Sequence, residues 1–269
     1  IKSSLTEHNR NVDATVKALI SEGKLESKAA AQNQCDIFTL DWTPIFESTL
    51  EAHSSRAQPR FGNGGRVSDC EIAPFPLERC QRVLYIRQNV YQEQMVWSAA
   101  IALAYLIENQ QVLVSGKHVI DLGAGTGYLG LVCSLAGAKT TITDLPEMLP
   151  HIIENANRNE LRDCVTISEY TWGQEKESGL TPPFDIVLVS DCLYVGYVIP
   201  LLLRAILYLS DATTQIFLSY RRRQNEEKQA FVLLSKVFDI TVCSQELLPR
   251  HLQNVDIYIC KLVRKCQRS

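Results

Sequence analysis

Apolar and polar residues follow two different periods along the C-terminal part of the chain. From residue 76 onward, short apolar runs typical of buried strands are separated by longer segments with the spacing of amphipathic helices. The runs predict strands at residues 118–121, 140–144, 165–170, 184–190 and 215–220. The longer segments predict helices at residues 128–136, 146–157, 197–209 and 225–238. Strands that alternate with helices in this way form a parallel sheet with helices on both faces.

The last two predicted strands, residues 240–243 and 256–263, are separated by a loop instead of a helix. Parallel neighbours need a crossover connection, so this pair should form an antiparallel hairpin at one edge of the sheet. We therefore predict an α/β domain over residues 76–269. Its sheet is doubly wound, seven-stranded and mostly parallel.

The first 75 residues have a different pattern. Residues 1–28 contain a short amphipathic helix, in which Asn11 caps the N-terminus, Val12 and Val16 share a face, and Gly23 ends the helix. Residues 5–19 resemble the last two helices of a ubiquitin-associated-type module, but we prefer a docking or solvated helix without ubiquitin function. Residues 29–75 have little periodicity and predict a linker or a docked extension.

Composition and charge narrow the class of function. The 27 basic and 30 acidic residues of this 269-residue chain argue against a nucleic-acid binder with a broad basic face. No apolar stretch reaches the ~20 residues of a membrane span, so no membrane partner is expected. The nine cysteines contain no Cys-x-x-Cys pair, so no metal is expected. Without a visible signal peptide, we expect a cytoplasmic protein, with the nucleus as a second location.

Candidate chemistry lies where the strand at 118–121 meets the helix at 128–136. Residues 121–127 read Asp-Leu-Gly-Ala-Gly-Thr-Gly. Glycines allow a sharp turn and a close approach of a ligand, and a doubly wound sheet opens a crevice at this point. Asp144 ends the next predicted strand, where its carboxylate can accept hydrogen bonds from both hydroxyl groups of a ribose.

Two cofactors compete for this loop. Residues 125–130 read Gly-Thr-Gly-Tyr-Leu-Gly and formally fit the dinucleotide fingerprint G-x-G-x-x-G. In that fingerprint the first glycine closely follows the strand, whereas here Asp121 and Gly123 already occupy the turn. An acid followed by alternate glycines is the pattern of a crevice for S-adenosylmethionine, which has no pyrophosphate to bind. We therefore predict S-adenosylmethionine over NAD, and a purely structural glycine turn is the remaining alternative.

Further motifs lie at residues 96–103, 141–145, 171–173 and 190–194, and the last of these reads Ser-Asp-Cys-Leu-Tyr. Together with the glycine loop and the strand at 256–259, they resemble the seven-β-strand protein-lysine methyltransferases of the methyltransferase-like group. Members of this group modify heat-shock chaperones and the valosin-containing AAA ATPase. The glycine loop alone marks the superfamily, whereas the Asp-x-x-Tyr and Trp-Gly elements narrow it to this branch. The resemblance implies a Rossmann-like methyltransferase fold.

The resemblance also implies a set of cofactor-binding residues. They are Trp97, Asp121, Gly123, Ala124, Gly125, Asp144, Leu145, Trp172 and Ser190. Trp97 would cover the methionine end of the cofactor, Asp144 would hold the ribose, and Trp172 would lie beside the adenine. The glycine loop would line the amino-acid moiety. The structural alternatives are core positions for both tryptophans, because large aromatics are mostly buried, and a helix-capping role for Asp144.

Asp191 and Tyr194 are the candidate catalytic residues. They follow the strand at 184–190, at the carboxyl edge where a doubly wound sheet presents its ligands, and they can face one cavity. Asp191 would attract and orient the incoming ammonium group, and Tyr194 would bound the channel near the methyl group. Alternatively, Asp191 caps the following helix and Tyr194 packs in the core.

We predict an S-adenosylmethionine-dependent protein-lysine methyltransferase. The expected substrate is a protein such as a chaperone or an AAA ATPase, and the enzyme is expected to be a monomer. The enzyme must position the amine and the methyl group, and the amine, with an ordinary pKa of ~10.4, must lose its proton. Two alternatives remain at this point: an inactive methyltransferase-like adaptor, and a methyltransferase for a small molecule or a nucleic acid.

Overall fold

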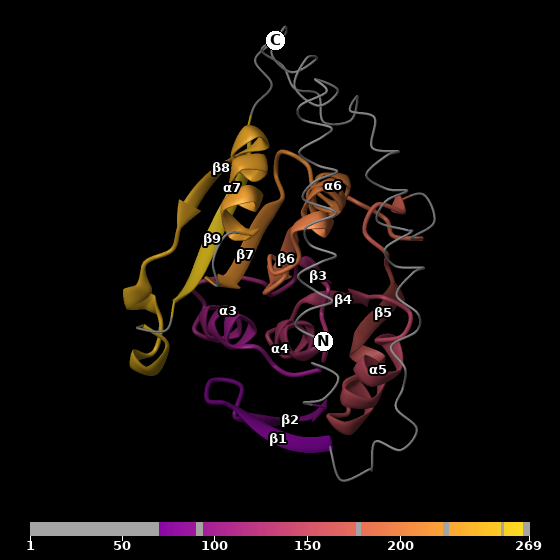
Figure 1. Cartoon of the computed structure of the whole chain (residues 1–269). Helices are drawn as coiled ribbons and strands as arrows, with labels where there is room; N and C mark the ends of the chain where they lie inside the picture. Colours follow the sequence, from indigo (N-terminus) through magenta and orange to yellow (C-terminus); the bar gives the residue numbers. More distant parts are fainter. Residues whose placement is uncertain (1–69, 90–93, 176–178, 223–225, 254–255, 266–269) are drawn as a thin grey trace, which may run out of the picture. The chain divides into compact units, whose positions relative to one another are not determined.

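The computed structural model describes residues 70–89, 94–175, 179–222, 226–253 and 256–265 (Figure 1). The helix predicted in residues 1–28 and most of the extension predicted at 29–75 lie outside the described residues.

Seven strands form the central sheet. They are β3 (His118–Leu122), β4 (Lys139–Asp144), β5 (Val165–Glu169), β6 (Ile186–Ser190), β7 (Gln215–Arg221), β8 (Phe238–Val242) and β9 (Ile257–Arg264). Their order is β5-β4-β3-β6-β7-β9-β8, and neighbours from β5 to β7 are parallel. Strand β9 runs antiparallel to both β7 and β8. The predicted antiparallel C-terminal pair is therefore confirmed, with β8 at the edge and β9 inserted inside the sheet.

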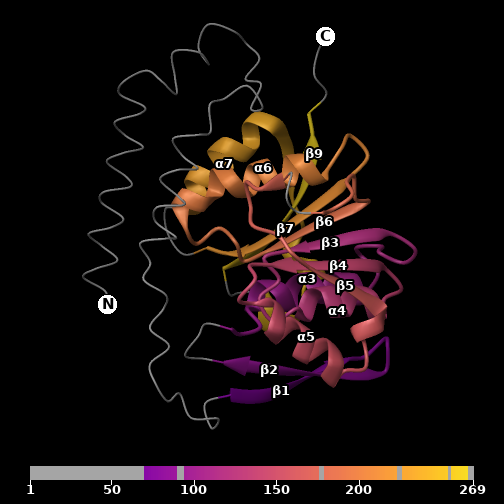
Figure 2. The ribbon, with the colours of Figure 1, turned by 90° about the vertical axis from the view of Figure 1, so that its right-hand side faces the viewer.

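Helices cover both faces of this sheet. They are α3 (Ser98–Glu108), α4 (Tyr128–Leu135), α5 (Leu149–Arg158), α6 (Ile199–Leu209) and α7 (Glu226–Val237). The short 3₁₀ helices are η4 (Arg162–Cys164), η6 (Gly196–Val198), η7 (Gln245–Leu247) and η8 (Arg250–Leu252). Helices α3, α4 and α5 lie on one face, and α6 and α7 lie on the other (Figures 1 and 2). This is the predicted doubly wound arrangement. Among the described helices, none combines the length and the apolar character that crossing a bilayer requires.

The two central strands are buried on both faces. Val119, Ile120 and Leu122 of β3 have no exposed surface, and the same is true of Val187 and Leu188 of β6. A strand that is covered by helices on both sides reads as a continuous apolar run, as these two do in the sequence. The centre of the sheet is therefore a rigid support for the loops that leave its carboxyl edge.

An N-terminal hairpin and the helix α3 were not predicted. The hairpin consists of β1 (Cys70–Leu77) and β2 (Arg82–Asn89), which pair antiparallel. It lies beyond the helix layer, next to α5 (Figures 1 and 2). Leu84 and Ile86 of β2 are fully buried, and the ring centroid of Phe75 lies 4.9 Å from that of Tyr128 in α4. Strand β1 begins at Cys70 and so crosses the predicted boundary between the extension and the domain.

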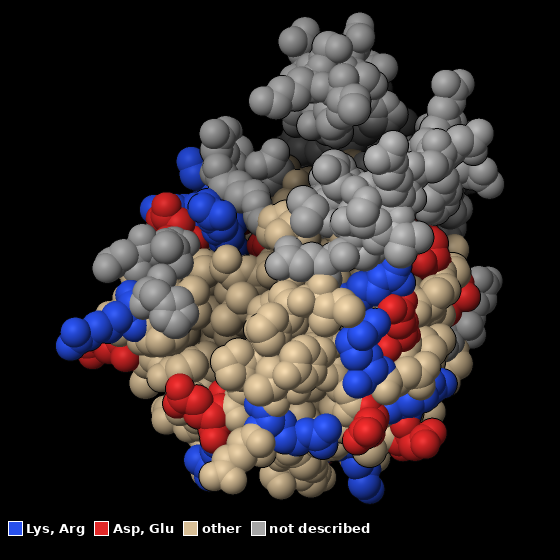
Figure 3. All heavy atoms as spheres, turned by 90° about the horizontal axis from the view of Figure 1, so that it is seen from below, with Lys and Arg blue, Asp and Glu red and all other residues tan. Residues whose placement is uncertain are grey.

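On the face seen from below in Figure 3, charged side chains of both signs lie around an uncharged centre. Arg87 and Arg158 both form ion pairs with Glu154 of α5. The charges on this face do not form a broad basic surface.

Candidate active site

The predicted site residues meet at the carboxyl edge of three neighbouring strands. Strand β3 is flanked by β4 and β6, and Leu122 at its end is in register with Thr143 on one side and Val189 on the other. The glycine loop, Asp144 and Ser190 therefore leave the sheet side by side. This edge is where the fold presents its ligands.

The loop after β3 leaves room for a ligand above Gly125. Gly123 and Gly125 have φ angles of 65° and 58°, in the left-handed region that favours glycine. A Cβ atom built on Gly125 would have no other atom within 4 Å. The N–H of Ala124 donates to the carbonyl of Thr143 at 3.0 Å, which ties the loop to β4. The loop is thus fixed to β4 through Ala124 and is open on the side of Gly125.

Asp144 is held in place by two backbone N–H groups. Gly125 donates to its Oδ2 at 2.7 Å, and Leu145 donates to its Oδ1 at 2.8 Å. Burial raises the pKa of this carboxyl group, and the two N–H groups act in the opposite direction. The capping alternative for Asp144 is wrong, because α5 begins at Leu149 and its N-cap residue is Met148. The predicted start of this helix at residue 146 is wrong for the same reason.

Asp121 is a buried carboxylate beneath the loop, with 1% of its surface exposed. Its Oδ2 accepts a hydrogen bond from the N–H of Gly130 at 3.0 Å, whereas its Oδ1 has no hydrogen-bond partner among the described residues. Burial raises the pKa of Asp121 to about 7, and the charge of Asp144 adds to this effect. A carboxylate in this state is stabilised by a proton or by a nearby cation.

Trp172 lies against the glycine loop. A Cβ atom built on Gly123 would come within 2.9 Å of Trp172 Cζ2 and 3.1 Å of Cys192 Sγ. The tryptophan side chain is half-buried, so it is not a fully enclosed core aromatic. Cys192 also lies against the glycine loop, although it was not among the predicted site residues. Its Sγ lies 3.5 Å from the carbonyl oxygen of Leu122. The only signal for it was its place inside the Asp-x-x-Tyr motif.

Trp97 stands at the start of α3, where its carbonyl accepts hydrogen bonds from the N–H groups of Ala100 and Ile101. Its side chain is 41% exposed, which excludes the core alternative. The preceding residue, Val96, donates its N–H to Oε1 of Gln88 at 2.7 Å, a buried contact with strand β2. The role of Trp97 at the methionine end of the cofactor stays a prediction.

Asp191 has a backbone conformation that is uncommon outside glycine. Its φ angle is 56°, in the left-handed region, and such strain in a non-glycine residue often marks a functional site. The side chain is buried, its N–H donates to Ser219 at 2.8 Å, and its Oδ1 accepts the N–H of Arg221 at 3.3 Å. The helix-capping alternative for Asp191 is wrong, because the caps of η6 and α6 involve no side chain.

Tyr194 lies in the same turn and is 60% exposed, so the core alternative for it is wrong. The structure therefore places one catalytic candidate inside the protein and the other at its surface. Ser190 is half-buried at the end of β6, and its Oγ accepts a hydrogen bond from Ser219 Oγ at 3.3 Å. The shared cavity of Asp191 and Tyr194 stays a prediction.

These residues fit S-adenosylmethionine, the predicted cofactor. The carboxylate of Asp144 is oriented beside the open space over Gly125. The buried Oδ1 of Asp121 suits a ligand with cationic groups. Within the described ranges, no cluster of His, Cys, Asp and Glu side chains could hold a metal ion.

Replacing Asp144 by alanine should weaken the binding of S-adenosylmethionine by roughly 1.5–3 kcal/mol, the usual contribution of a hydrogen bond to a charged group. The substitution removes the expected ribose acceptor and releases the N–H groups of Gly125 and Leu145. Calorimetric titration with S-adenosylhomocysteine measures the loss, with the exposed Asp163→Ala on η4 as the control. Unchanged affinity in Asp144→Ala, or heat with NAD in place of S-adenosylhomocysteine, would contradict the assignment.

Comparison with known proteins identifies relatives of this chain. Residues 80–237 match a family described as lysine methyltransferases. Protein N-lysine methyltransferase METTL21A of Danio rerio is 34% identical over 149 residues, which are 54% of this chain and 68% of that protein. EEF1A lysine methyltransferase 3 of Xenopus tropicalis is 35% identical over 172 residues, which are 63% of this chain and 74% of that protein.

A solved structure supports the fold. The T. Thermophilus 16S rRNA N2 G1207 methyltransferase RsmC, in complex with AdoMet and guanosine, matches with a TM-score of 0.51 and 16% identity. The match covers 73% of this chain and 51% of that chain. At this identity the likeness concerns the fold alone, and it agrees with the predicted Rossmann-like methyltransferase fold.

Proposed function

The chain belongs to the lysine methyltransferase family, because more than half of its length matches that family, and we propose that the protein it methylates is a chaperone or an AAA ATPase. It is an S-adenosylmethionine-dependent enzyme that transfers methyl groups to lysine side chains of a protein substrate. The proposal for the substrate class rests on the Asp-x-x-Tyr and Trp-Gly motifs, which resemble the branch that modifies such proteins.

The observation that carries the choice of an amine substrate is the turn after β6. Asp191 is buried there in a left-handed conformation. It directly follows β6, and β6 pairs with β3, the strand from which the glycine loop leaves. Its Oδ1 accepts the N–H of Arg221 at the end of β7, so the carboxylate has a defined orientation. A fixed carboxylate at the carboxyl edge can attract a lysine ammonium group and direct it toward the cofactor.

Each residue of the site has one task in this proposal. S-adenosylmethionine, when bound, supplies the electrophilic methyl group. Asp144 would orient the cofactor through its ribose, and Trp172 would confine it against the glycine loop. Asp191 would align the amine, and Tyr194 would bound the channel through which the lysine enters. The amine must lose its proton before it reacts, and water at the exposed end of the channel can take that proton.

A direct methylation assay tests the substrate class. The enzyme is incubated with isotope-labelled S-adenosylmethionine and a purified heat-shock chaperone, a valosin-containing AAA ATPase or elongation factor 1A, and mass spectrometry locates the label. Elongation factor 1A is a second candidate, because a relative with 35% identity is named EEF1A lysine methyltransferase 3. Labelled lysine in the chaperone or the ATPase is the expected result. Label in elongation factor 1A alone would contradict the proposed class, and label in none of them would favour another protein.

We further propose that the enzyme acts as a monomer, in the cytoplasm and also in the nucleus. Light scattering at several protein concentrations tests the first point, and microscopy of the tagged full-length protein tests the second. A mass that corresponds to a dimer, or exclusive localisation in another compartment, would contradict these proposals.

A further inference from the structure

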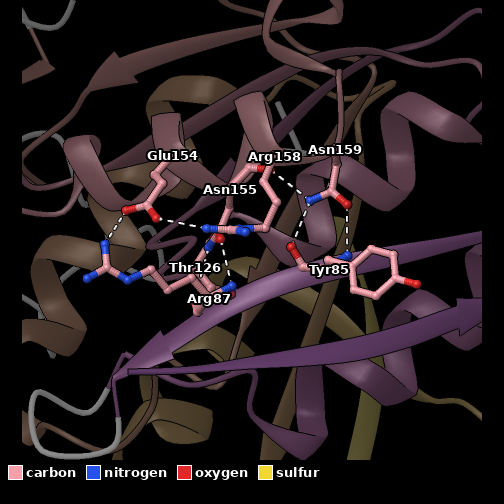
Figure 4. Close-up of polar contacts among 7 residues, drawn as sticks. All are labelled: Tyr85, Arg87, Thr126, Glu154, Asn155, Arg158 and Asn159. Atoms are coloured by element: carbon pink, nitrogen blue, oxygen red, sulfur yellow. Dashed lines mark hydrogen bonds and ion pairs between the residues drawn. The ribbon is translucent and has the colours of Figure 1, made fainter. Parts of the chain in front are cut away.

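Asn155 is a fully buried polar side chain on α5, with no exposed surface. Its Oδ1 accepts the N–H of Arg87 at 2.8 Å, and its Nδ2 donates to the carbonyl of Arg87 at 3.2 Å (Figure 4). The same Nδ2 donates to the carbonyl of Thr126 at 3.0 Å. The side-chain amide therefore bonds to strand β2 as a neighbouring strand would, and it bonds at the same time to a second segment. A buried amide without hydrogen-bond partners costs free energy of folding, so this arrangement of α5, β2 and the second segment is favoured over alternatives that leave the amide unpaired.

The second segment is the glycine loop. Thr126 stands between Gly125 and Gly127 and is buried. The N–H of Gly125 donates to Asp144, and the carbonyl of the next residue, Thr126, accepts from Asn155. Two successive residues of the loop are thus held by side chains from β4 and α5. The conformation of the open part of the loop depends on both.

Strand β2, which Asn155 contacts through Arg87, is also bonded to the segment that carries Trp97. Gln88 follows Arg87 in β2, and its Oε1 accepts the N–H of Val96 at 2.7 Å. This bond is buried, and Val96 directly precedes Trp97. A continuous path of hydrogen bonds and one strand therefore runs from the glycine loop, through Asn155 and β2, to the segment that carries the tryptophan.

Asn159 repeats the strand contact one helical turn later but does not reach the loop. Its Oδ1 accepts the N–H of Tyr85 at 2.8 Å, and its Nδ2 donates to the carbonyl of Tyr85 at 3.0 Å (Figure 4). The same Nδ2 also donates to the carbonyl of Asn155 at 2.8 Å. The two asparagines therefore make equivalent bonds to β2. They differ in the further bond of Nδ2, which goes to the glycine loop from Asn155 and back to a carbonyl of α5 from Asn159. Asn159 is a matched control for the loss of the strand contact.

We propose that Asn155 is a positioning residue of the methyltransferase: it holds the glycine loop in register with β2 and so with the segment that carries Trp97. The inference rests on the proposed roles of the loop and of Trp97 in cofactor binding. Asn155 touches neither the cofactor nor the substrate in this account. It acts through the backbone carbonyl of Thr126 and through Arg87.

The test compares Asn155→Ala with Asn159→Ala in the full chain. Both variants should lower the melting temperature, because each removes two bonds to β2. Only Asn155→Ala should raise the dissociation constant of S-adenosylhomocysteine, by roughly tenfold, the size typical of residues that couple to a site without contacting it. In methylation assays its KM for S-adenosylmethionine should rise by more than its kcat falls.

If Asn155→Ala does not fold, Gln88→Ala replaces it, because this variant removes one bond at the other end of the path. Equal affinities for S-adenosylhomocysteine in the wild type and in the folded variant would overturn the proposal, as would an equal loss in Asn159→Ala. Because the readout is binding, a wild type that binds S-adenosylhomocysteine but methylates no protein would contradict the proposed function alone. A wild type that does not bind it would contradict the cofactor site on which both depend.

Discussion

Asp191→Asn should lower kcat about 100-fold, the loss expected when a group that orients the reactants no longer holds them in line. Asparagine keeps the size of the side chain and can still accept the N–H of Arg221, so the left-handed turn should be retained. It loses the negative charge that attracts and aligns the lysine ammonium group. The affinity for S-adenosylhomocysteine should remain close to that of the wild type, because Asp191 is not among the residues expected to contact the cofactor.

Asp185→Asn is the matched control for this variant. Asp185 directly precedes the opposite end of β6. It is exposed and also accepts a backbone N–H, that of His118 at 2.8 Å. Its replacement should leave kcat unchanged. Tyr194→Phe should lower kcat in the same direction as Asp191→Asn without loss of folding, because the side chain is mostly exposed. If both active-site variants methylated the substrate at the wild-type rate, the assignment of Asp191 and Tyr194 as catalytic residues would be wrong. The assignment of the cofactor-binding residues would not be affected.

Asp121→Asn should make the unliganded protein more resistant to neutral and alkaline pH. The pKa of Asp121 is about 7 in the folded protein, whereas its ordinary value is 3.8. The folded state therefore binds the proton more tightly than the unfolded state, and the wild type loses stability as the pH rises from about 4 to about 7. Asparagine carries no charge and has no such loss.

Between pH 5 and pH 8, the free energy of unfolding of Asp121→Asn relative to the wild type should increase by about 2–3 kcal/mol, at 1.36 kcal/mol for each pKa unit. Urea denaturation at the two pH values measures this difference, and the exposed Asp163→Asn should show none. Binding of S-adenosylhomocysteine should become weaker in Asp121→Asn, because the ammonium group of its amino-acid moiety loses a nearby carboxylate. A pH-independent difference in stability would contradict the raised pKa of the buried group.

The strands of the sheet could be predicted because their signal is local. Strands β3 and β6 are continuous apolar runs in the sequence because helices cover both of their faces. The reversed strand β9 could be predicted because the sequence before it lacks the pattern of a crossover helix. The start of α5 could not, because residues 146–148 form a turn in which Met148 donates its N–H to the carbonyl of Leu145.

The N-terminal hairpin gave no clear signal because its stability comes from distant partners. Pro74 and Pro76 lie in β1, and proline argues against a strand unless the strand is at an edge. Among the described strands, β1 pairs only with β2, so its prolines are tolerated. Helix α3 was missed for a different reason. Buried residues occur around most of its circumference, so its sequence lacks the amphipathic period that predicts a helix.

By itself, the sequence determined the alternation of strands and helices, the glycine loop after β3, and the acids Asp121, Asp144 and Asp191 at strand ends. Those features are local, since they depend on the residue types within one strand and the turn that follows it. Only the tertiary structure decided that Trp172 lies against Gly123, that Asp191 is buried in a left-handed turn, and that Asn155 joins the glycine loop to β2. The bond between Arg87 and Asn155 joins residues 68 positions apart, and it exists because the packing of α5 brings the two backbones within reach of one amide. Periodicity along a chain contains no information about such a contact.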